Sequence, residues 1–244
     1  TGEKKYHAVI RENYKSYDVF QTGFISDFRG FDYDDLLFYA GLPNADRRVA
    51  REIKSALRPS KTINDDPYRS PITEYTWGSN STKSRAGALQ SHPLTRSAQS
   101  YADGANYLHY LHGVNPLGLV YLSNMSEFGA TTSVSTFYHS WFPDGSADYD
   151  QVGVSTYGPL PGYLVGGPNP YYKRADCCPE ECGPDGNKWC KTAPVTPPYG
   201  EPAMKAYGEF NEGWPWASWE VTENSLGYQS AYIRLLSRYV EPEE

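Results

Sequence analysis

The sequence predicts an all-α fold of helical hairpins joined by long loops, as found in α/α toroids. Five segments of the 244-residue chain carry helix signals, whereas strand-like runs are limited to short candidates such as 118–122. Two long stretches, 61–96 and 114–221, show neither pattern but are rich in aromatic residues, Gly and Pro. Such long connections are typically functional or disordered, and this composition favours ordered, site-forming loops. No internal boundary is evident, so we expect one domain over residues 1–244.

The first two helices are predicted from apolar spacing. One runs from Lys4 to Phe20, and the second covers Asp34 to Ala40 and ends at Gly41, a residue that often terminates helices because it adopts left-handed backbone angles. The side chains expected to face inward from the first helix are Tyr6, Val9, Ile10, Tyr14 and Tyr17.

The third helix has the clearest pattern. Asn44 is expected to cap its start, and Pro59 to end it. Between them, Val49, Ile53 and Leu57 repeat every four positions, as one buried helix face requires.

The last two helices are predicted over residues 97–112 and after Thr222, with helical apolar spacing from Leu226 onward. Gly113 closes the fourth helix. In the fifth, Thr222 is expected to be the N-cap, which places Glu223 in the first turn. Its apolar face comprises Tyr228, Tyr232, Leu235, Leu236 and Tyr239.

Composition narrows the classes of ligand. The formal charge is −7, and the chain holds 22 Tyr and 6 Trp. An acidic chain is a poor partner for nucleic acid, whose phosphates attract Lys and Arg. No apolar run is long enough to span a membrane. Abundant aromatic residues beside Asp, Asn and Gln suit sugars, although a Tyr-rich core with no ligand is the alternative. Because Thr1 is not an initiator Met and no signal peptide is present, we expect a processed, trimmed or partial chain.

All four cysteines fall in one short, Pro- and Gly-containing window: Cys177, Cys178, Cys182 and Cys190. An even, clustered count predicts two disulfides and an oxidising, extracellular compartment. Three pairings are open, and we favour those in which each of the adjacent cysteines bridges to one of the other two. A zinc site is the rival interpretation, but the window has no Cys-x-x-Cys pair and no His.

The segment from Glu223 to Ser230, Glu-Asn-Ser-Leu-Gly-Tyr-Gln-Ser, resembles the acid motif near the C-terminus of glycoside hydrolase family nine, mainly inverting cellulases. Gln229 stands where Asn is usual, and Trp214 stands where the family has an Asp. The resemblance implies that Glu223 is the general acid. The alternative for a Glu at such a position is a carboxylate that complements the helix dipole.

The resemblance covers most of the chain and is densest from Tyr107 to Val240. It implies an (α/α)6 toroid, a six-hairpin barrel, of which this chain supplies roughly the C-terminal half. The N-terminal half would be a second chain or sequence absent here.

Trp77 lies in a Trp-Gly-Ser-Asn segment that resembles part of the family's substrate cleft. Its indole offers a flat apolar face to the C–H bonds of a sugar ring, and Gly78 lets the backbone pass close. Tyr228, within the acid motif, is a further expected substrate contact. The alternative for Trp77 is a buried core residue.

The segment around His139 resembles the family's His signature, in which a His and an Arg two residues later contact the sugar. His139 matches the His, but Trp141 occupies the Arg position. A Trp can stack on a sugar but cannot donate a fork of hydrogen bonds. A structural His is the alternative.

Two groups of residues suggest metals. Asp144, Asp148 and Asp150 could hold a structural calcium ion, since some family members carry calcium, but a solvated acidic loop is the competing interpretation. His109 and His112 lie three apart on a helix, and with no third ligand in view we favour packing. The chemistry implied by the resemblance requires no cofactor.

The resemblance implies inverting hydrolysis of β-1,4-glucosidic bonds in cellulose or related β-glucans. That reaction needs two carboxylates roughly 6.5–9.5 Å apart. The family's base belongs to an Asp-x-x-Asp motif in the N-terminal half. Residues 32–35 have this spacing but are predicted to begin a helix. The alternatives are a non-hydrolytic glycan-binding module and an inactive remnant.

Overall fold

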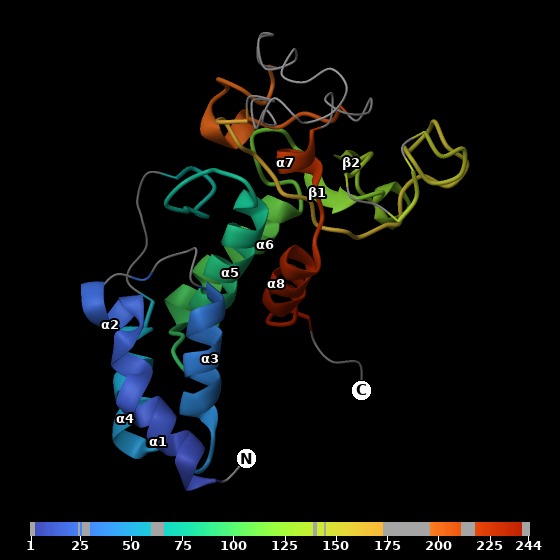
Figure 1. The fold of residues 1–244 in the computed structure, drawn as a ribbon. Coiled ribbons are helices and arrows are strands. Elements are labelled where there is room, and N and C mark those ends of the chain that lie inside the picture. Colours follow the sequence, from blue (N-terminus) through green and yellow to red (C-terminus); the bar gives the residue numbers. More distant parts are fainter. Residues whose placement is uncertain are drawn as a thin grey trace, which may run out of the picture. The chain divides into compact units, whose positions relative to one another are not determined.

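The structure, a computed structural model, describes residues 3–23, 25, 30–59, 66–138, 141–143, 145–172, 196–210 and 218–240. Its regular elements in these ranges are mainly helices, with two short strands (Figure 1). The main elements are α1 (Lys4–Asn13), α2 (Asp18–Thr22), α3 (Gly30–Gly41), α4 (Arg47–Ala56), α5 (Ser79–Gln90), α6 (Ala98–Leu111), β1 (Val120–Ser123), β2 (Ser133–Val134), α7 (Trp219–Thr222) and α8 (Leu226–Leu236). Within the same ranges, no helix combines the length and apolarity needed to cross a bilayer.

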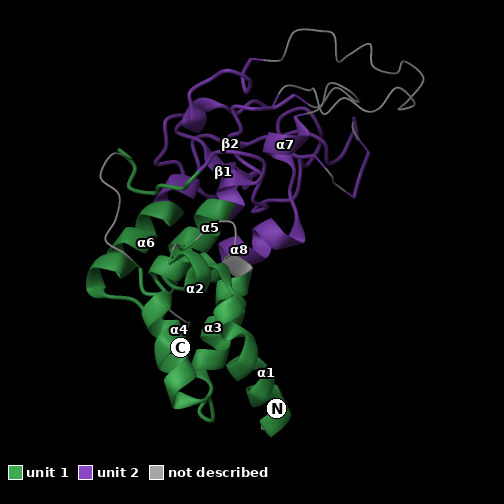
Figure 2. Cartoon of the chain, turned by 60° about the vertical axis from the view of Figure 1, so that its left-hand side comes forward, with its two compact units in different colours: residues 1–73, 82–108, 234–244 green, residues 74–81, 109–233 purple. Residues whose placement is uncertain are grey.

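The chain divides into two compact units, coloured separately in Figure 2. Unit 1 comprises Thr1–Thr73, Thr82–Leu108 and Arg234–Glu244, and unit 2 comprises Glu74–Ser81 and His109–Ile233. Helices α5, α6 and α8 each begin in one unit and continue into the other. The expectation of a single domain stays a prediction.

Unit 1 is organised around an apolar core between α3 and α4. The predicted face of the third helix is confirmed, because Val49, Ile53 and Leu57 are completely buried. Leu36 and Leu37 of α3 are each 1% exposed and belong to the same cluster. This segment forms a helix because its apolar residues fall on one stripe and its charged residues on the other.

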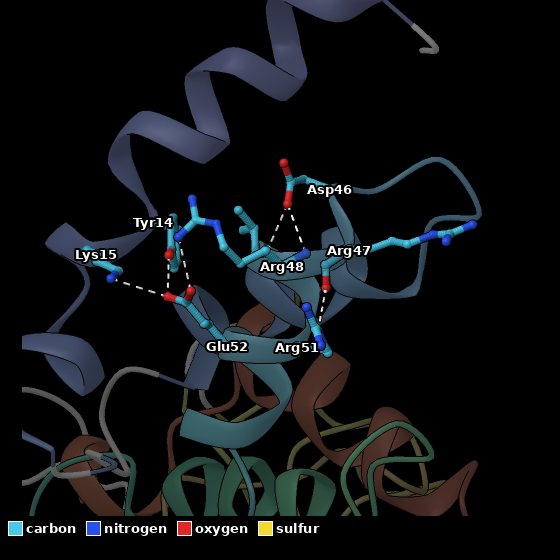
Figure 3. Close-up of polar contacts among 8 residues, drawn as sticks. Tyr14, Lys15, Asp46, Arg47, Arg48, Arg51 and Glu52 are labelled. Atoms are coloured by element: carbon cyan, nitrogen blue, oxygen red, sulfur yellow. Dashed lines mark hydrogen bonds and ion pairs between the residues drawn. The ribbon is translucent and has the colours of Figure 1, made fainter.

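Helix α4 begins two residues later than the sequence indicated. Asp46, and not Asn44, is the N-cap: its Oδ1 accepts the backbone N–H of Arg48 at 2.9 Å and of Val49 at 3.0 Å (Figure 3). The bond from Val49 is the largest reason why the pKa of Asp46 is below its usual value. The predicted cap was wrong because two residues in this stretch have suitable side chains, and only Asp46 directly precedes the helix.

The first predicted helix, Lys4 to Phe20, is interrupted. Helix α1 ends at Asn13, a 3-10 turn covers Tyr14–Ser16, and Tyr17 adopts extended angles before α2. Tyr14 is buried as expected and donates its hydroxyl to Glu52, which also pairs with Lys15 at 3.2 Å (Figure 3). Tyr6 and Val9 were expected to face inward, but they are 50% and 55% exposed.

Helix α5 was not predicted, because its sequence, Ser-Asn-Ser-Thr-Lys-Ser-Arg-Ala-Gly-Ala-Leu-Gln, has no apolar stripe. Its first six residues are nevertheless almost completely buried. Lys83, with no exposed surface, donates to the backbone carbonyl of Ser70 and to its hydroxyl. Gly87 permits close packing on α6, since a Cβ there would lie 2.8 Å from the Cβ of Tyr107. Small side chains and individual buried hydrogen bonds, such as those of Lys83, therefore replace hydrophobic patterning in this helix.

Helix α6 confirms the fourth predicted helix to within one residue at each end. Its start is a reciprocal cap: Ser97 Oγ accepts the N–H of Ser100 at 3.0 Å, and Ser100 Oγ accepts the N–H of Ser97 at 2.8 Å. The arrangement follows the capping-box principle, with Ser in place of the usual Glu.

Unit 2 has little regular structure in its described part. Strands β1 and β2 pair in parallel, and β1 overlaps the strand candidate 118–122. Leu122 of β1 bridges to Leu164, and both side chains are buried, as is Val165. These loops are therefore ordered around a core of their own, as their composition suggested.

Candidate active site

Glu223 and Trp77 meet directly. The indole Nε1–H of Trp77 donates a 2.7 Å hydrogen bond to Oε2 of Glu223, although 146 positions separate the two residues. Trp77 is 42% exposed, so it is not the buried core residue considered as its alternative. The side chain is instead a partly accessible ring with its polar edge on a carboxylate.

Glu223 is not in a helical first turn, so that prediction was wrong. Helix α7 ends at Thr222, Glu223 has extended backbone angles, and α8 begins only at Leu226. The hydroxyl of Ser225 accepts the N–H of Tyr228 at 3.1 Å and so caps α8 in place of Thr222. The helix-dipole interpretation of Glu223 is thereby removed.

The backbone of Glu223 is fixed on three sides. Its N–H donates to the backbone carbonyl of Trp219 at 2.8 Å, and its carbonyl accepts the N–H of Gly166 at 2.7 Å. Glu223 also forms an isolated backbone β-bridge with Tyr138. The N–H of Tyr138 donates to the carbonyl of Thr222 at 3.2 Å. Three segments far apart in the sequence therefore define where this carboxylate can lie.

The loop of residues 164–167, Leu-Val-Gly-Gly, is hydrogen-bonded to the segments that carry Trp77 and Glu223. The carbonyl of Gly166 accepts the N–H of Asn80 at 3.0 Å, and the Nδ2 of Asn80 donates to Val165 at 3.1 Å. Gly167 has φ of +89°, and a Cβ on it would lie 2.3 Å from the side chain of Asn80. These contacts tie the loop to the segment that carries Trp77.

Aromatic side chains gather around the carboxylate. The ring of Trp219 meets Trp77 edge-on, with centroids 4.9 Å apart, and Tyr172 meets Trp219 in the same way at 6.5 Å. Tyr228 lies over Gly78, where a Cβ would be 2.7 Å from the tyrosine hydroxyl oxygen. The close approach expected at Gly78 is thus to a protein side chain, Tyr228.

Gln229, which stands where the family has Asn, has a structural role. Its Oε1 accepts the N–H of Leu164 at 2.9 Å, and its Nε2 donates to the carbonyl of Gly162 at 2.9 Å. The longer amide therefore satisfies both ends on one loop and holds α8 against it.

The other two predicted substrate contacts are Trp141 and His139. Trp141 is 67% exposed, with its ring 5.0 Å from Tyr149 and 5.4 Å from Phe142 between centroids. His139 lies outside the described residues, as does Asp144. The four predicted disulfide residues lie outside them too: Cys177, Cys178, Cys182 and Cys190.

Metal binding has no structural support within the part of the chain that is described, where no three His, Cys, Asp or Glu residues group to hold an ion. Both members of the His109 and His112 pair are exposed, and His112 Nε2 lies 2.9 Å from the hydroxyl of Tyr232. Burial, followed by the charge of His109, lowers the pKa of His112. Burial also raises the pKa of Tyr232 to about 12.

Sequence reasoning missed two carboxylates of unit 2, one buried and one half-buried. Glu220 is 7% exposed and accepts a hydrogen bond from the amide of Asn169, itself 1% exposed. Glu209 accepts the N–H of Ser135 at 2.9 Å and the hydroxyl of Tyr207 at 3.0 Å. Asn169 follows the Gly-Gly-Pro run of the supporting loop, but no local pattern pointed to its acidic partner.

Solved structures of known proteins share this fold. Two solved structures, "GH family 9 endoglucanase J30" and a "metagenome-derived glycoside hydrolase family 9 endoglucanase", each superpose with a TM-score of 0.60 at 18% identity over 98% of this chain. A Zn-binding triple mutant of the J30 protein gives the same values as J30 itself. The chain spans 39% of the J30 protein and 37% of the metagenome-derived one. No curated protein matches significantly.

The structural likeness confirms the fold class, an all-α (α/α)6 toroid of which this chain forms a part. The sequence model of Glycosyl hydrolase family 9 matches residues 1–236, almost the whole chain. The chain therefore belongs to glycosyl hydrolase family 9.

Proposed function

We propose that this chain supplies the general acid, Glu223, to a catalytic domain that hydrolyses β-1,4-glucosidic bonds in cellulose or related β-glucans with inversion. The observation that carries the proposal is the 2.7 Å bond from the Trp77 indole to the Glu223 carboxylate. It joins the two motifs that resemble the family's acid and cleft segments. It also leaves the acid beside a 42% exposed aromatic face on which a sugar ring can stack.

In the proposed reaction, Glu223 gives its proton to the glycosidic oxygen as the bond to the anomeric carbon breaks. A water molecule attacks that carbon from the opposite face and loses its proton to a second carboxylate. That base is an Asp of the N-terminal portion of the domain, which is not among these 244 residues. Support for a further portion comes from the 37–39% of the solved endoglucanases that this chain spans.

The substrate in this proposal is held by aromatic stacking and one imidazole. Trp77 and Tyr228 lie beside the acid, while Trp141 and His139 extend the contact toward neighbouring sugars. Neutral glucan suits them, because flat apolar faces and hydroxyl groups match the two faces and the rim of a pyranose. Secretion, with the four cysteines paired in two disulfides, fits a polymeric extracellular substrate.

The test is reducing-sugar release from a soluble β-1,4-glucan by the native protein and by its Glu223→Gln variant. We expect release from the native protein and a loss of at least about a hundredfold in the variant, because the amide cannot donate the required proton. Equal release by both would refute the role of Glu223. If neither releases sugar but both are retained by glucan in a gel, the domain is a glycan-binding module.

The second portion is tested by the intact mass of the native protein. We expect either a longer polypeptide or a co-purifying chain. Recovery of full hydrolytic activity in a single 27.4 kDa species would contradict the proposed external base.

A further inference from the structure

Unit 2 contains a cleft whose lining residues differ from all those placed around Glu223. Its volume is about 470 Å³, and its walls come from residues 124–128 and 152–161. Phe128 and Tyr157 line it and are 69% and 67% exposed. Large aromatic side chains with so much free surface are unusual for packing alone.

The two walls are joined, so the cleft is formed before any ligand arrives. The Nδ2 of Asn124 donates to the carbonyl of Tyr157 at 3.1 Å and to that of Pro159 at 2.8 Å. The N–H of Tyr157 in turn donates to the backbone carbonyl of Asp148 at 2.8 Å. A rigid site loses less conformational entropy on binding than a mobile one.

The lining indicates the chemistry of the ligand. Exposed aromatic faces alternate with hydroxyl groups from Ser126 and Thr156 and with one carboxylate, Glu127, and no basic side chain lines the cleft. An anionic ligand would find no counter-charge here, and an apolar ligand would take the Glu127 carboxylate out of water with no compensating hydrogen bond. A neutral chain of sugar rings satisfies both kinds of group.

A row of aromatic rings links this cleft to a predicted substrate contact. Tyr157 stacks on Tyr149 with centroids 5.8 Å apart, and Tyr149 lies 5.0 Å from the ring of Trp141. Trp141 and Tyr157, at the two ends of the row, are each 67% exposed. We propose that the cleft of Phe128 and Tyr157 is a second binding site for β-1,4-glucan, which continues along the row of rings to Trp141. The choice of glucan rests on the proposed function.

The test measures retention of the full chain in native gels containing hydroxyethylcellulose, in a Glu223→Gln background so that hydrolysis does not intervene. We expect the double variant Phe128→Ala/Tyr157→Ala to weaken the apparent affinity about tenfold, as loss of two exposed aromatic contacts does at other binding sites. Phe128→Trp, which keeps a flat face, should be retained like the parent.

Two matched variants control for general effects. Val154→Ala removes a 76% exposed side chain from the same loop but outside the cleft, and Phe38→Ala removes a 74% exposed aromatic ring from unit 1. Both should be retained like the parent. Circular dichroism of the double variant should match the parent, since the removed rings are mostly in solvent.

Unchanged retention of the double variant would overturn the proposal, and so would a parent that no β-1,4-glucan retains. Loss of retention in Phe128→Trp equal to that in the double variant would also count against stacking. The hydrolytic role of Glu223 fails separately, through equal sugar release by wild type and Glu223→Gln, because retention is measured without hydrolysis.

Discussion

Unit 1 and unit 2 hold their residues in place by different means. In unit 1, apolar side chains such as Val49, Ile53 and Leu57 fill a core with no exposed surface. In unit 2, the segments around Glu223 are joined by hydrogen bonds from Asn80 and Gln229 to loop backbone. Apolar volume tolerates exchange of similar side chains, whereas a hydrogen-bonded loop depends on individual atoms. We expect the folded core to tolerate conservative change better than the site does.

The largest expected effect tests the apolar half of this comparison. Ile53→Ala removes a completely buried side chain and should lower the free energy of unfolding by about 4 kcal/mol, through lost burial and a residual cavity. Ile233→Ala makes the same chemical change at a 53% exposed position of α8 and should cost less than about 1 kcal/mol. Urea unfolding measures both. Equal losses would mean that the core of unit 1 is not what stabilises it.

The next effect tests the backbone-dependent half. Gly167→Ala should cost about 3 kcal/mol or more, because φ is +89° and the new Cβ would lie 2.3 Å from Asn80. Gly162→Ala is the matched control: φ is again +89°, but a Cβ there meets nothing within 4 Å. It should cost about 1 kcal/mol, from backbone strain alone. If the two variants unfold at the same urea concentration, packing against Asn80 does not support the site.

A smaller effect concerns activity. Trp77→Phe keeps an aromatic face but removes the donor to Glu223, so it should lower kcat about tenfold, the worth of one hydrogen bond to a charged group. KM should change less, since the face that stacks on sugar remains. Thermal unfolding of the variant is the control for structural damage. A rise in KM with unchanged kcat would assign Trp77 to binding alone.

The smallest expected effect is a dependence of stability on pH that comes from His92 in unit 1. Burial, followed by the charge of Arg238, lowers the pKa of His92 from 6.5 to about 4, and its Nδ1 accepts the N–H of Leu94 at 3.2 Å. The unfolded chain therefore takes up this proton below pH 6.5, while the folded chain resists it down to about pH 4. Stability is complete above pH 6.5 and falls as the pH decreases toward 4.

Partial exposure reduces the loss from His92 to about 1 kcal/mol. His92→Asn retains an acceptor without the titration, so its unfolding curve should vary less over this pH range. His112 in unit 2, whose pKa is also lowered, contributes in the same direction and remains in the variant. An identical pH profile in wild type and His92→Asn would exclude His92 as the source.

Sequence reasoning succeeded where one physical signal dominates. The stripe of Val49, Ile53 and Leu57 identified α4, since a strand would place Arg51 and Ser55 on the same face. It failed for α5, where Ser79 to Ser84 are polar yet buried, because their partners come from distant segments. It also chose Thr222 over Ser225 as a cap, since both satisfy the local rule and only the path of the loop decides.

The candidate site shows the same division. The family resemblance pointed to Glu223, Trp77 and Tyr228 separately, and all three lie in unit 2. Their assembly depends on Gly166, Asn80 and Gln229, whose contacts span 57 to 87 positions along the chain. No local pattern carries information at that range, so the partners of the acid were not predictable. The positions of His139 and of the four cysteines stay predictions.

The hydrogen bond from Trp77 makes one of the chain's six indoles a spectroscopic reporter on the acid. In a ¹H–¹⁵N correlation spectrum, an N–H held by a carboxylate resonates downfield of indoles in water and exchanges slowly with deuterium. A sugar that draws Glu223 away would shift this peak, so occupancy of the site could be followed without turnover.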